Sequence, residues 1–217
     1  MSIFVCGTDT DVGKTVYSAA LMARYSSIAD VRYWKPVQTG ADDDDRANVL
    51  QLSGLEPERF ESTSLHFSQP LSPHRAAELD DSRIEPKQIL TQLARLRERG
   101  PLIVEGAGGL LVPLTRNYTW LDFLKESGLP IAVVARSGLG TINHSLLTLE
   151  TLRRHNLIVR GIAFLGPSLP DNSRTVSEFS GVPVLASFDL PDPARTKPWS
   201  PPDPDPAGLL KPDLTRA

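Results

Sequence analysis

The sequence predicts an α/β fold, a three-layer α/β/α sandwich around a mostly parallel central sheet. Short apolar runs of strand length alternate along the chain with segments whose apolar residues recur at helical spacing. Several of these runs are almost uninterrupted, as strands are when helices cover both faces of a parallel sheet. The 217 residues suffice for one such domain with a sizeable core and are few for two.

The apolar runs predict six strands, and turn residues mark where several of them end. Pro36 and the Thr39-Gly40 turn end the second strand, and Glu105 ends the third just before a glycine cluster. A further apolar run covers residues 110–114. The predicted strands are residues 3–6, 31–37, 101–105, 131–135, 158–165 and 182–188.

Between the strands, helical spacing and capping residues predict the helices. Pro86 opens one helix in its first turn and Gly100 stops it, while the Thr119 side chain can cap another. Residues 60–74 are predicted to be irregular, with Ser72-Pro73-His74 at the start of a helix. The predicted helices cover residues 15–25, 45–52, 72–78 and 173–179, with further helices following Pro86, Thr119 and His144.

Composition and charge narrow the class of protein. Hydrophobic residues make up 40% and charged residues 23%, as in ordinary soluble domains, and the net charge is −3. We therefore expect neither nucleic acid nor a membrane as a partner. No apolar run is long enough to span a membrane, and Met1 leads straight into a strand rather than a signal peptide, so a cytoplasmic location is expected. The single cysteine, Cys6, is expected in the core.

The C-terminal part differs in composition from the rest. Eight of the 19 prolines fall within residues 191–212, where large apolar residues are few. We therefore predict a single domain over residues 1–190. Residues 191–217 would form a tail that is extended or disordered, or one tied down by another surface.

The first strand runs into a glycine-bounded loop, Gly7-Thr-Asp-Thr-Asp-Val-Gly13-Lys14-Thr15, and the loop runs into a helix. Loop and helix N–H groups in such an arrangement point at the phosphates of a nucleotide. Lys14 would neutralise the β and γ oxygens, and the Thr15 hydroxyl would bind Mg²⁺. Five residues rather than the usual four separate the two glycines. The loop predicts a P-loop NTPase-like fold that uses a nucleoside triphosphate with Mg²⁺.

Two carboxylates are candidates for completing the metal site. Glu105 ends an apolar strand, where its charge would be costly unless it met a cation such as the Mg²⁺ held by Thr15. The alternative is that Glu105 caps backbone N–H groups of the glycine turn. Asp45 is the second candidate because it opens a helix, whereas Asp42, Asp43 and Asp44 are expected in a solvated loop.

Lys35 closes the second strand beside the phosphate loop. In a parallel α/β sheet, ligands bind at the carboxyl ends of the strands. Lys35 is therefore expected to bind transferring phosphoryl oxygens or an anionic reactant. The alternative is a solvent-exposed lysine at a strand end. His66, His155 and Trp199 are expected to be structural or surface groups, and His74 stays undecided.

Other chemistries lack their motifs. The sequence has no Cys/His cluster at zinc spacing and no Gly-x-Ser-x-Gly. Cys6 lies inside a predicted strand, so no cysteine is placed to hydrolyse glutamine.

Five motifs in order resemble the dethiobiotin synthetase family, and the resemblance covers residues 2 to about 190. The motifs are Gly7–Thr15, Lys35-Pro-Val-Gln-Thr-Gly40, Ser72-Pro-His74, Glu105-Gly-Ala-Gly-Gly109 and Gly140-Thr-Ile-Asn-His144. The long loop spacing is that family's own variant. The resemblance implies a cyclo-ligase of biotin biosynthesis that makes dethiobiotin from 7,8-diaminopelargonic acid, CO2 and ATP. The route would pass through a carbamate and a carbamic-phosphoric anhydride.

The resemblance also implies roles for individual residues. The catalytic residues would be Thr10, Asp11, Lys14 and Lys35, and the Mg²⁺ ligands Thr15, Asp45 and Glu105. The nucleotide site would comprise Asp11, Val12, Gly13, Lys14, Thr15, Val16, Asp45, Glu105, Gly108, Leu165, Phe188 and Leu190. The substrate site would comprise Lys35, Thr39, Pro73, Gly108, Gly109, Leu139, Gly140, Thr141 and Asn143. The segment from Gly140 to Asn143 would reach the substrate of a neighbouring subunit, which implies a homodimer with the site at its interface.

The chain departs from this family where many members carry an asparagine that contacts the purine. Phe164-Leu-Gly-Pro-Ser168 occupies that region, and Phe188-Asp-Leu-Pro191 also differs from the family pattern. ATP is the expected nucleotide, with relaxed use of others such as CTP predicted.

Two other classes of protein share the general fold. A nucleotide-switch ATPase of the partitioning or septum-positioning type would usually carry a second lysine early in its loop, where this chain has Gly7-Thr-Asp-Thr. A catalytically silent regulatory domain would not be expected to retain Lys14, Lys35, Asp45 and Glu105 together.

Overall fold

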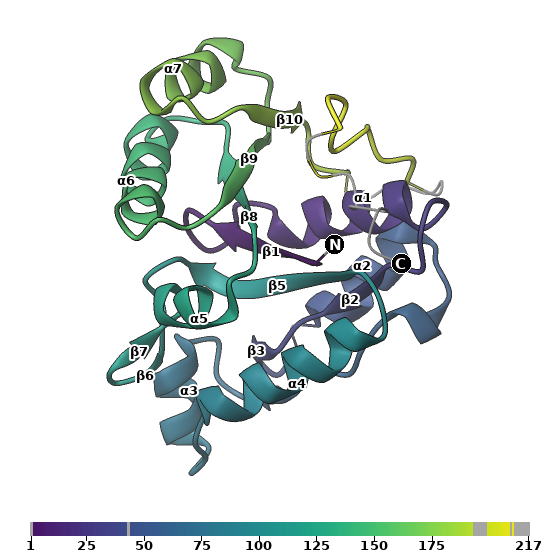
Figure 1. Ribbon diagram of the computed structural model, residues 1–217, viewed down its shortest axis with the longest axis vertical. Coiled ribbons are helices and arrows are strands. Elements are labelled where there is room, and N and C mark those ends of the chain that lie inside the picture. Colours follow the sequence, from purple (N-terminus) through teal and green to yellow (C-terminus); the bar gives the residue numbers. More distant parts are fainter. Residues whose placement is uncertain (1, 43, 193–198, 209, 211–217) are drawn as a thin grey trace.

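A six-stranded parallel sheet forms the middle layer of the protein (Figure 1). The structure is a computed structural model that describes residues 2–42, 44–192, 199–208 and 210. The strand order is β10-β9-β8-β1-β5-β2. These strands are β1 (Ser2–Gly7), β2 (Arg32–Trp34), β5 (Leu102–Gly109), β8 (Ile131–Arg136), β9 (Val159–Leu165) and β10 (Val184–Phe188). The predicted parallel sheet is confirmed.

Helices cover both faces of this sheet, which confirms the three layers (Figure 1). Alternate residues of β1 face opposite ways: Ile3 and Val5 pack toward α1, while Phe4 and Cys6 join the core on the other side. One face carries α1 (Lys14–Tyr25) and α2 (Asp45–Ser53). The other face carries α3 (Pro73–Leu79), α4 (Pro86–Glu98), α5 (Trp120–Ser127), α6 (Thr141–Arg154) and α7 (Pro170–Ser180). A short 3-10 helix covers Pro57–Arg59.

The predicted second strand, residues 31–37, is wrong as one element. It divides into β2 and β3 (Val37–Thr39), and β3 pairs with β4 (Leu65–Phe67) in a separate two-stranded sheet. The division falls at Lys35-Pro36, because proline has no N–H to continue the ladder of the main sheet. The strand β4 also lies in a segment that was predicted to be irregular.

The third predicted strand is longer than its apolar run indicates. It continues through the glycine cluster, where Gly7 of β1 pairs with Gly109 of β5. Glu105 therefore lies inside β5 rather than at its end, opposite Val5. Beyond β5 the chain forms a small hairpin from β6 (Pro113–Thr115) and β7 (Tyr118–Thr119).

Capping residues account for the starts of two helices. Thr119 and Asp122 form a capping box at α5, as the predicted Thr119 cap requires. The helix α7 begins three residues before the predicted Ser173, because Pro170 occupies its first turn, where a missing N–H costs nothing. No helix within the described residues has the length and apolarity needed to cross a membrane.

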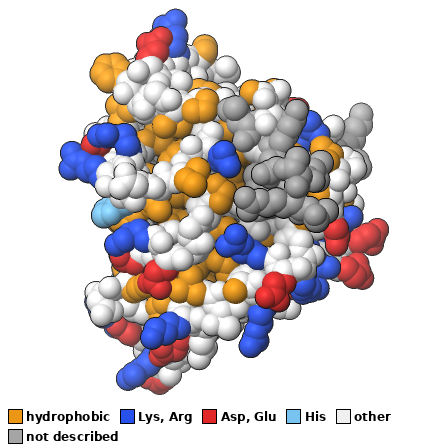
Figure 2. Space-filling model, viewed as in Figure 1, with side chains coloured by type: hydrophobic (Ala, Val, Ile, Leu, Met, Phe, Trp, Pro, Cys, Tyr) orange, Lys and Arg blue, Asp and Glu red, His pale blue; other side chains and the backbone are white. Residues whose placement is uncertain are grey.

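Around these elements, the surface shows a clear division by chemical type. Figure 2 shows charged side chains around the rim of the viewed face and apolar side chains through its left half. In the same view of Figure 1, the strands β1 and β5 point toward that left side, where α5 and α6 lie.

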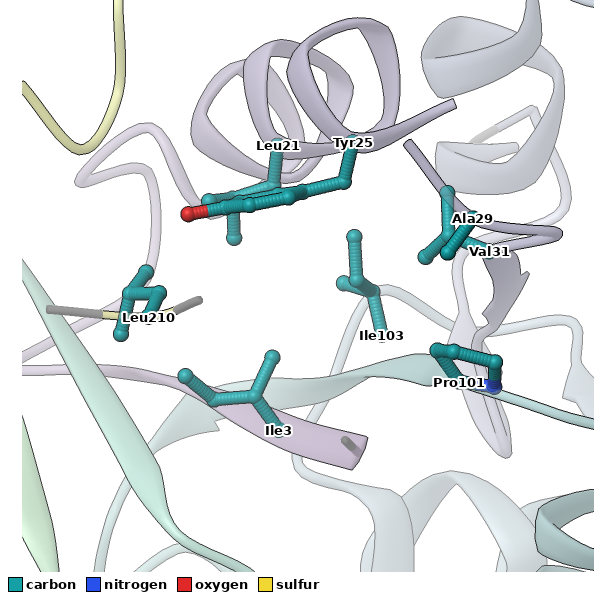
Figure 3. Close-up of a pocket in the computed structure, with 8 residues that line it drawn as sticks. All are labelled: Ile3, Leu21, Tyr25, Ala29, Val31, Pro101, Ile103 and Leu210. Carbon is teal, nitrogen blue, oxygen red and sulfur yellow. The ribbon is translucent and has the colours of Figure 1, made fainter. Parts of the chain in front are cut away.

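The described part of the tail, residues 199–208 and Leu210, packs on α1. The Tyr17 hydroxyl donates a hydrogen bond to the Pro204 carbonyl oxygen (3.0 Å), and the Tyr25 hydroxyl donates one to Asp205 Oδ2 (2.5 Å). Leu210 is fully buried and lines a small apolar pocket with Ile3 and Tyr25 (Figure 3). This part of the tail is therefore tied down.

The prediction for the rest of the tail concerns residues that the structure does not describe. Residues 193–198, 209 and 211–217 lie outside the described residues, as does Asp43 of the aspartate run. The domain boundary at residue 190 stays a prediction. Trp199 packs against the core on the α1 face, in agreement with its expected structural role.

Replacing Leu210 by Ala is expected to lower the free energy of unfolding by about 2–4 kcal/mol, because a fully buried leucine loses its contacts. The matched control is Leu169→Ala, at a leucine that is 44% exposed, which should change stability by less than about 1 kcal/mol. Urea unfolding followed by circular dichroism measures both values. Equal effects of the two substitutions would show that the tail does not contribute to the core.

Candidate functional site

The phosphate loop lies at the centre of the sheet, between the end of β1 and the start of α1. β1 has β8 on one side and β5 on the other, so the loop lies where the order of strands reverses, which is where α/β sheets bind ligands. Gly13 precedes α1 with φ at 95°, in the left-handed region that favours glycine. A Cβ atom there would lie 2.6 Å from Leu165 Cδ2. Both the conformation and the crowding require glycine at this position.

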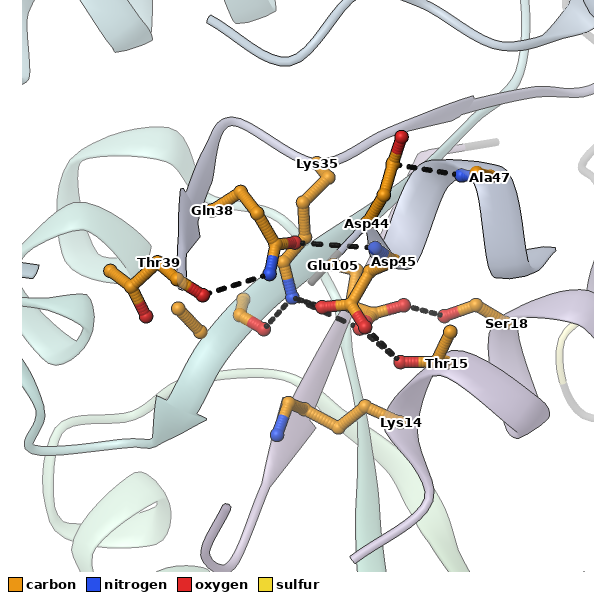
Figure 4. A network of polar contacts seen from close by, with 12 residues as sticks. Lys14, Thr15, Ser18, Lys35, Gln38, Thr39, Asp44, Asp45, Ala47 and Glu105 are labelled. Atoms are coloured by element: carbon orange, nitrogen blue, oxygen red, sulfur yellow. Dashed lines mark hydrogen bonds and ion pairs between the residues drawn. The ribbon is translucent and has the colours of Figure 1, made fainter. Parts of the chain in front are cut away.

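Lys35 lies beside the loop in a cluster with the buried Glu105 and the half-buried Asp45 (Figure 4). Its Nζ atom is 2.5 Å from Asp45 Oδ2 and 3.1 Å from Glu105 Oε1, and it also donates to the Gly106 carbonyl oxygen (3.1 Å). A solvent-exposed Lys35, the alternative that the sequence left open, is therefore wrong. The ammonium group is held between two carboxylates at the edge of the phosphate site.

The charges of this cluster stabilise one another. Burial opposes the charge of Lys35, but the Glu105 and Asp45 carboxylates outweigh burial and raise its pKa above the ordinary value. Burial likewise opposes the charge of Asp45, and Lys35 outweighs it, so the pKa of Asp45 is lowered. Lys14 has its pKa lowered by burial and by the nearby Lys35. An anion bound beside Lys14 would favour its protonated form.

Three oxygens converge next to Lys35 in an arrangement that suits a metal ion. Thr15 Oγ1 lies 2.8 Å from Asp45 Oδ1 and 3.1 Å from Glu105 Oε1, although a hydroxyl has only one hydrogen to donate. In an octahedral Mg²⁺ shell with bonds of about 2.1 Å, neighbouring ligand oxygens lie about 3 Å apart. The donor chemistry and the spacing both fit Mg²⁺.

The rest of a metal shell would have to come from elsewhere. Among the described residues, no three His, Cys, Asp or Glu side chains form a group that could hold a metal. Two carboxylates and one hydroxyl leave positions for phosphate oxygens and water, which is how Mg²⁺ is usually bound at nucleotide sites. Among the described residues, the hydrogen bonds that Glu105 accepts all come from side chains and none from a backbone N–H group. The alternative prediction, that Glu105 caps the glycine turn, is therefore wrong.

A cleft of about 750 Å³ runs from the phosphate loop past Lys35 toward α3, a size common for small-molecule sites. The predicted residues that line it are Thr10, Asp11, Gly13, Lys14, Thr15, Val16, Lys35, Thr39, Asp45, Pro73, Gly108 and Leu190. Sequence reasoning did not place Gln38, Pro70, Leu71, Ser72, Ala107 and Val112 in the site. The loop of residues 68–73 reaches the cleft because Asp80 accepts hydrogen bonds from the Ser68 N–H and hydroxyl.

Other predicted residues do not line this cleft. Val12, Leu165 and Phe188 are buried in the core on the α1 face, and Glu105 lies behind Thr15. Gly109 packs against the backbone of Thr8. These positions can support the site from behind, but the structure does not place them on its surface.

The predicted substrate residues at the start of α6 lie apart from the cleft of their own chain. Leu139 is fully exposed, and Gly140 precedes the helix with φ at 90°. Thr141 is buried, and its hydroxyl lies 3.3 Å from the Ser145 hydroxyl. Asn143 follows on the first turn of the helix. The structure therefore does not bring these four residues together with Lys35.

Two further residues of the Glu105 environment were missed from the sequence. Ser18 Oγ donates to Glu105 Oε2 at 2.8 Å, and the Tyr33 hydroxyl donates to the same oxygen at 3.0 Å. Ser18 lies one helical turn after Thr15, a spacing that places both side chains on one face of α1. Nothing in the local sequence marks Tyr33, because its contact depends on the pairing of β2 with β5.

A likeness to solved structures supports the fold. The ParA family ATPase from Chlorobium tepidum matches with a TM-score of 0.58 at 13% identity, covering 88% of this chain and 84% of that one. At this identity the likeness concerns the fold alone. A sequence family described as an AAA domain matches residues 1–193. Together with the loop at the switch point of the sheet, these findings define a P-loop nucleotide-binding protein.

Sequence relatives place the chain more narrowly. The ATP-dependent dethiobiotin synthetase BioD of Novosphingobium aromaticivorans is 44% identical over 196 residues, covering 86% of this chain and 90% of the relative. The biotin biosynthesis bifunctional protein BioCD of Bordetella avium is 42% identical over 219 residues, covering 99% of this chain and 45% of that longer protein. The chain belongs to the dethiobiotin synthetase family, and the resemblance of the five motifs is confirmed.

Gly13→Ala is expected to destabilise the protein more than Gly54→Ala. Both glycines have positive φ, but a Cβ at Gly54 would meet nothing within 4 Å, whereas one at Gly13 would meet Leu165. Gly54→Ala should cost about 1 kcal/mol for conformation alone, and Gly13→Ala at least about 2 kcal/mol. Urea unfolding measures both, and equal costs would show that Leu165 yields without resistance.

Proposed function

We propose that this chain is a dethiobiotin synthetase that uses ATP and Mg²⁺ to carboxylate 7,8-diaminopelargonic acid and close its ureido ring. The single observation that carries the proposal is the buried cluster of Lys35, Asp45 and Glu105 facing Thr15 of the phosphate loop. Family membership supports the choice of this reaction over a nucleotide switch or a silent regulatory domain. The soluble enzyme would work in the cytoplasm.

The phosphate loop and the start of α1 would bind the triphosphate. Loop N–H groups and the positive end of the helix favour its negative charge. Lys14 is buried and donates to the Asp9 carbonyl oxygen of the loop at 3.2 Å, where its ammonium group would neutralise the β and γ oxygens. Thr10 and Asp11 line the same part of the cleft and would position the transferred group.

Thr15, Asp45 and Glu105 would hold the Mg²⁺ ion. When bound, Mg²⁺ would neutralise charge on the β and γ phosphates, where phosphoryl transfer depends mainly on positioning and electrostatics. Asp45 would stay in reach because its helix is fixed by the Asp44 side chain, which accepts a hydrogen bond from the Ala47 N–H at 2.9 Å.

Lys35 would act on the anionic reactants. One amine of the substrate adds CO2 and loses a proton, which gives a carbamate. A carbamate oxygen then attacks the γ phosphorus, which releases ADP and forms a carbamic-phosphoric anhydride. The second amine attacks the carbonyl carbon, closes the ring and expels phosphate. Lys35, fixed by two carboxylates, would hold the carbamate and γ-phosphate oxygens in line.

The remaining cleft would hold the diamine itself. Thr39, Pro73 and Gly108 line this cleft together with residues of the phosphate loop. Gly109 would contribute only by allowing β5 to approach Thr8 closely. A substrate lying there would present its amines to Lys35.

The start of α6 would serve the site of a second copy in a homodimer. Leu139 is fully exposed and Leu147 is 61% exposed, and apolar side chains are exposed on this side of the molecule (Figure 2). The N-terminus of α6, with Gly140, Thr141 and Asn143, would receive the substrate carboxylate from the neighbouring subunit. Sedimentation should show a dimer, and a fully active monomer would contradict this arrangement.

The activity is tested by phosphate release from ATP with and without diaminopelargonate and bicarbonate. Phosphate release is expected to require both, with dethiobiotin formed in equal amount. Turnover that is stimulated instead by lipid or by a protein partner would favour the nucleotide switch, and nucleotide binding without turnover would favour the regulatory domain.

Within that assay, Lys35→Ala is expected to lower the rate of ring formation by at least about 100-fold, because a cation at the transferring phosphoryl group is lost. Loss of a buried partner also destabilises the cluster, so the fold is checked by circular dichroism at the assay temperature. The control is Lys125→Ala, at a lysine exposed on α5. A folded Lys35→Ala variant with a near wild-type rate would remove Lys35 from the reaction.

The site is expected to discriminate weakly between nucleotide bases. In the segments where the family's base-contacting residues would lie, Leu165 and Leu190 flank Gly13 with apolar side chains. Apolar contacts discriminate weakly between bases that differ in their hydrogen-bonding groups. Turnover numbers with ATP and CTP should agree within about 10-fold. Strict dependence on ATP would show that other residues read the base.

A further inference from the structure

We propose that Ser18 and Tyr33 are positioning residues that hold Glu105 so that only its Oε1 atom faces the metal site. This inference rests on the proposed function, because it takes Glu105 as a Mg²⁺ ligand. Glu105 is fully buried within β5, so each of its oxygens needs a partner from the protein. Its two oxygens have different partners: Thr15 contacts Oε1 and Ser18 contacts Oε2 (Figure 4).

The Oε2 atom is occupied by protein donors. Ser18 Oγ donates to it at 2.8 Å and the Tyr33 hydroxyl at 3.0 Å. Two such bonds use both lone pairs of this oxygen. The Oε1 atom instead faces Thr15 Oγ1 and Lys35 Nζ, both at 3.1 Å. The carboxylate would therefore bind a metal through one oxygen.

The two donors come from different elements that lie next to Glu105. Ser18 lies on α1, one turn after Thr15, so a single helix supplies a partner to each oxygen. Tyr33 lies on β2, which pairs with β5 next to Glu105. Both side chains are fully buried.

This arrangement has a measurable consequence for metal affinity. Residues that orient a metal ligand typically contribute about 10- to 100-fold to metal affinity or activity. Without its Oε2 partners, Glu105 could rotate or turn toward Lys35 alone, and the converging set of Thr15, Asp45 and Glu105 oxygens would be lost. The affinity for nucleotide without metal should change little, because neither residue touches the phosphate loop's binding surface.

The test uses Tyr33→Phe, Ser18→Ala and the double variant of the full chain. Mg²⁺ is titrated into each protein with a non-hydrolysable ATP analogue, and binding is followed by calorimetry. Each single variant should bind Mg²⁺ about 10-fold more weakly, with metal-free binding of the analogue within about twofold of wild type. Glu105→Gln serves as the reference for loss of the ligand itself.

A matched control separates positioning from the loss of any buried hydroxyl. Tyr17 is also a fully buried tyrosine, but its hydroxyl donates to the Pro204 carbonyl oxygen, away from the site. Tyr17→Phe should leave Mg²⁺ affinity within about twofold of wild type. If it weakens Mg²⁺ binding as much as Tyr33→Phe does, the effect is a general loosening of α1 and the inference is overturned.

The other possible results also support or overturn the proposed roles of Ser18 and Tyr33. If a folded variant, either Tyr33→Phe or Ser18→Ala, binds Mg²⁺ as tightly as wild type, the substituted residue does not position Glu105. If Tyr33→Phe does not fold, the result for Ser18→Ala decides the test. Nucleotide binding that is independent of Mg²⁺ in wild type overturns the inference as well. A wild-type protein that binds Mg²⁺ and nucleotide but forms no dethiobiotin would defeat the proposed function and leave the positioning roles intact.

Discussion

The structure depends on a buried charge cluster in which Lys35 lies between Asp45 and Glu105. Charges removed from water are costly unless they are paired and hydrogen-bonded, and each member of this cluster has several partners. The end of β2 before Pro36 also places Lys35 in this cluster. The chain leaves the main sheet at Lys35-Pro36, which directs the lysine across the end of β2 toward β5 rather than into another ladder position.

Local signals in the sequence predicted most elements because those signals act over a few residues. The Thr119 cap, Pro86 at a helix start and the apolar strands all appear where expected. The wrong expectations depended on pairing between distant segments. β5 continues through its glycines because Gly109 pairs with Gly7, and β4 forms because β3 lies beside it. No local pattern contains either pairing.

The same contrast between local sequence signals and contacts of distant segments holds for the site. The phosphate loop is contiguous, so its sequence carries its function. Lys35 could be predicted from its place at a strand end and Asp45 from its place at a helix start, and both line the cleft. The partners of Glu105 are set by tertiary packing, so Ser18 and Tyr33 escaped detection. The segment that starts α6 lies outside the cleft of its own chain, and the role proposed for it requires a second subunit that a single chain does not contain.

Helix α1 connects these features and explains how a proline-rich tail can matter to the fold. Its start faces the phosphate site, while Thr15 and Ser18 contact Glu105. Further along the helix, the Tyr17 and Tyr25 hydroxyls donate hydrogen bonds to the tail. Proline-rich backbone makes few hydrogen bonds of its own and keeps its carbonyl oxygens available as acceptors. A tail that forms neither helix nor strand in its described part can therefore be held on α1 by two tyrosines.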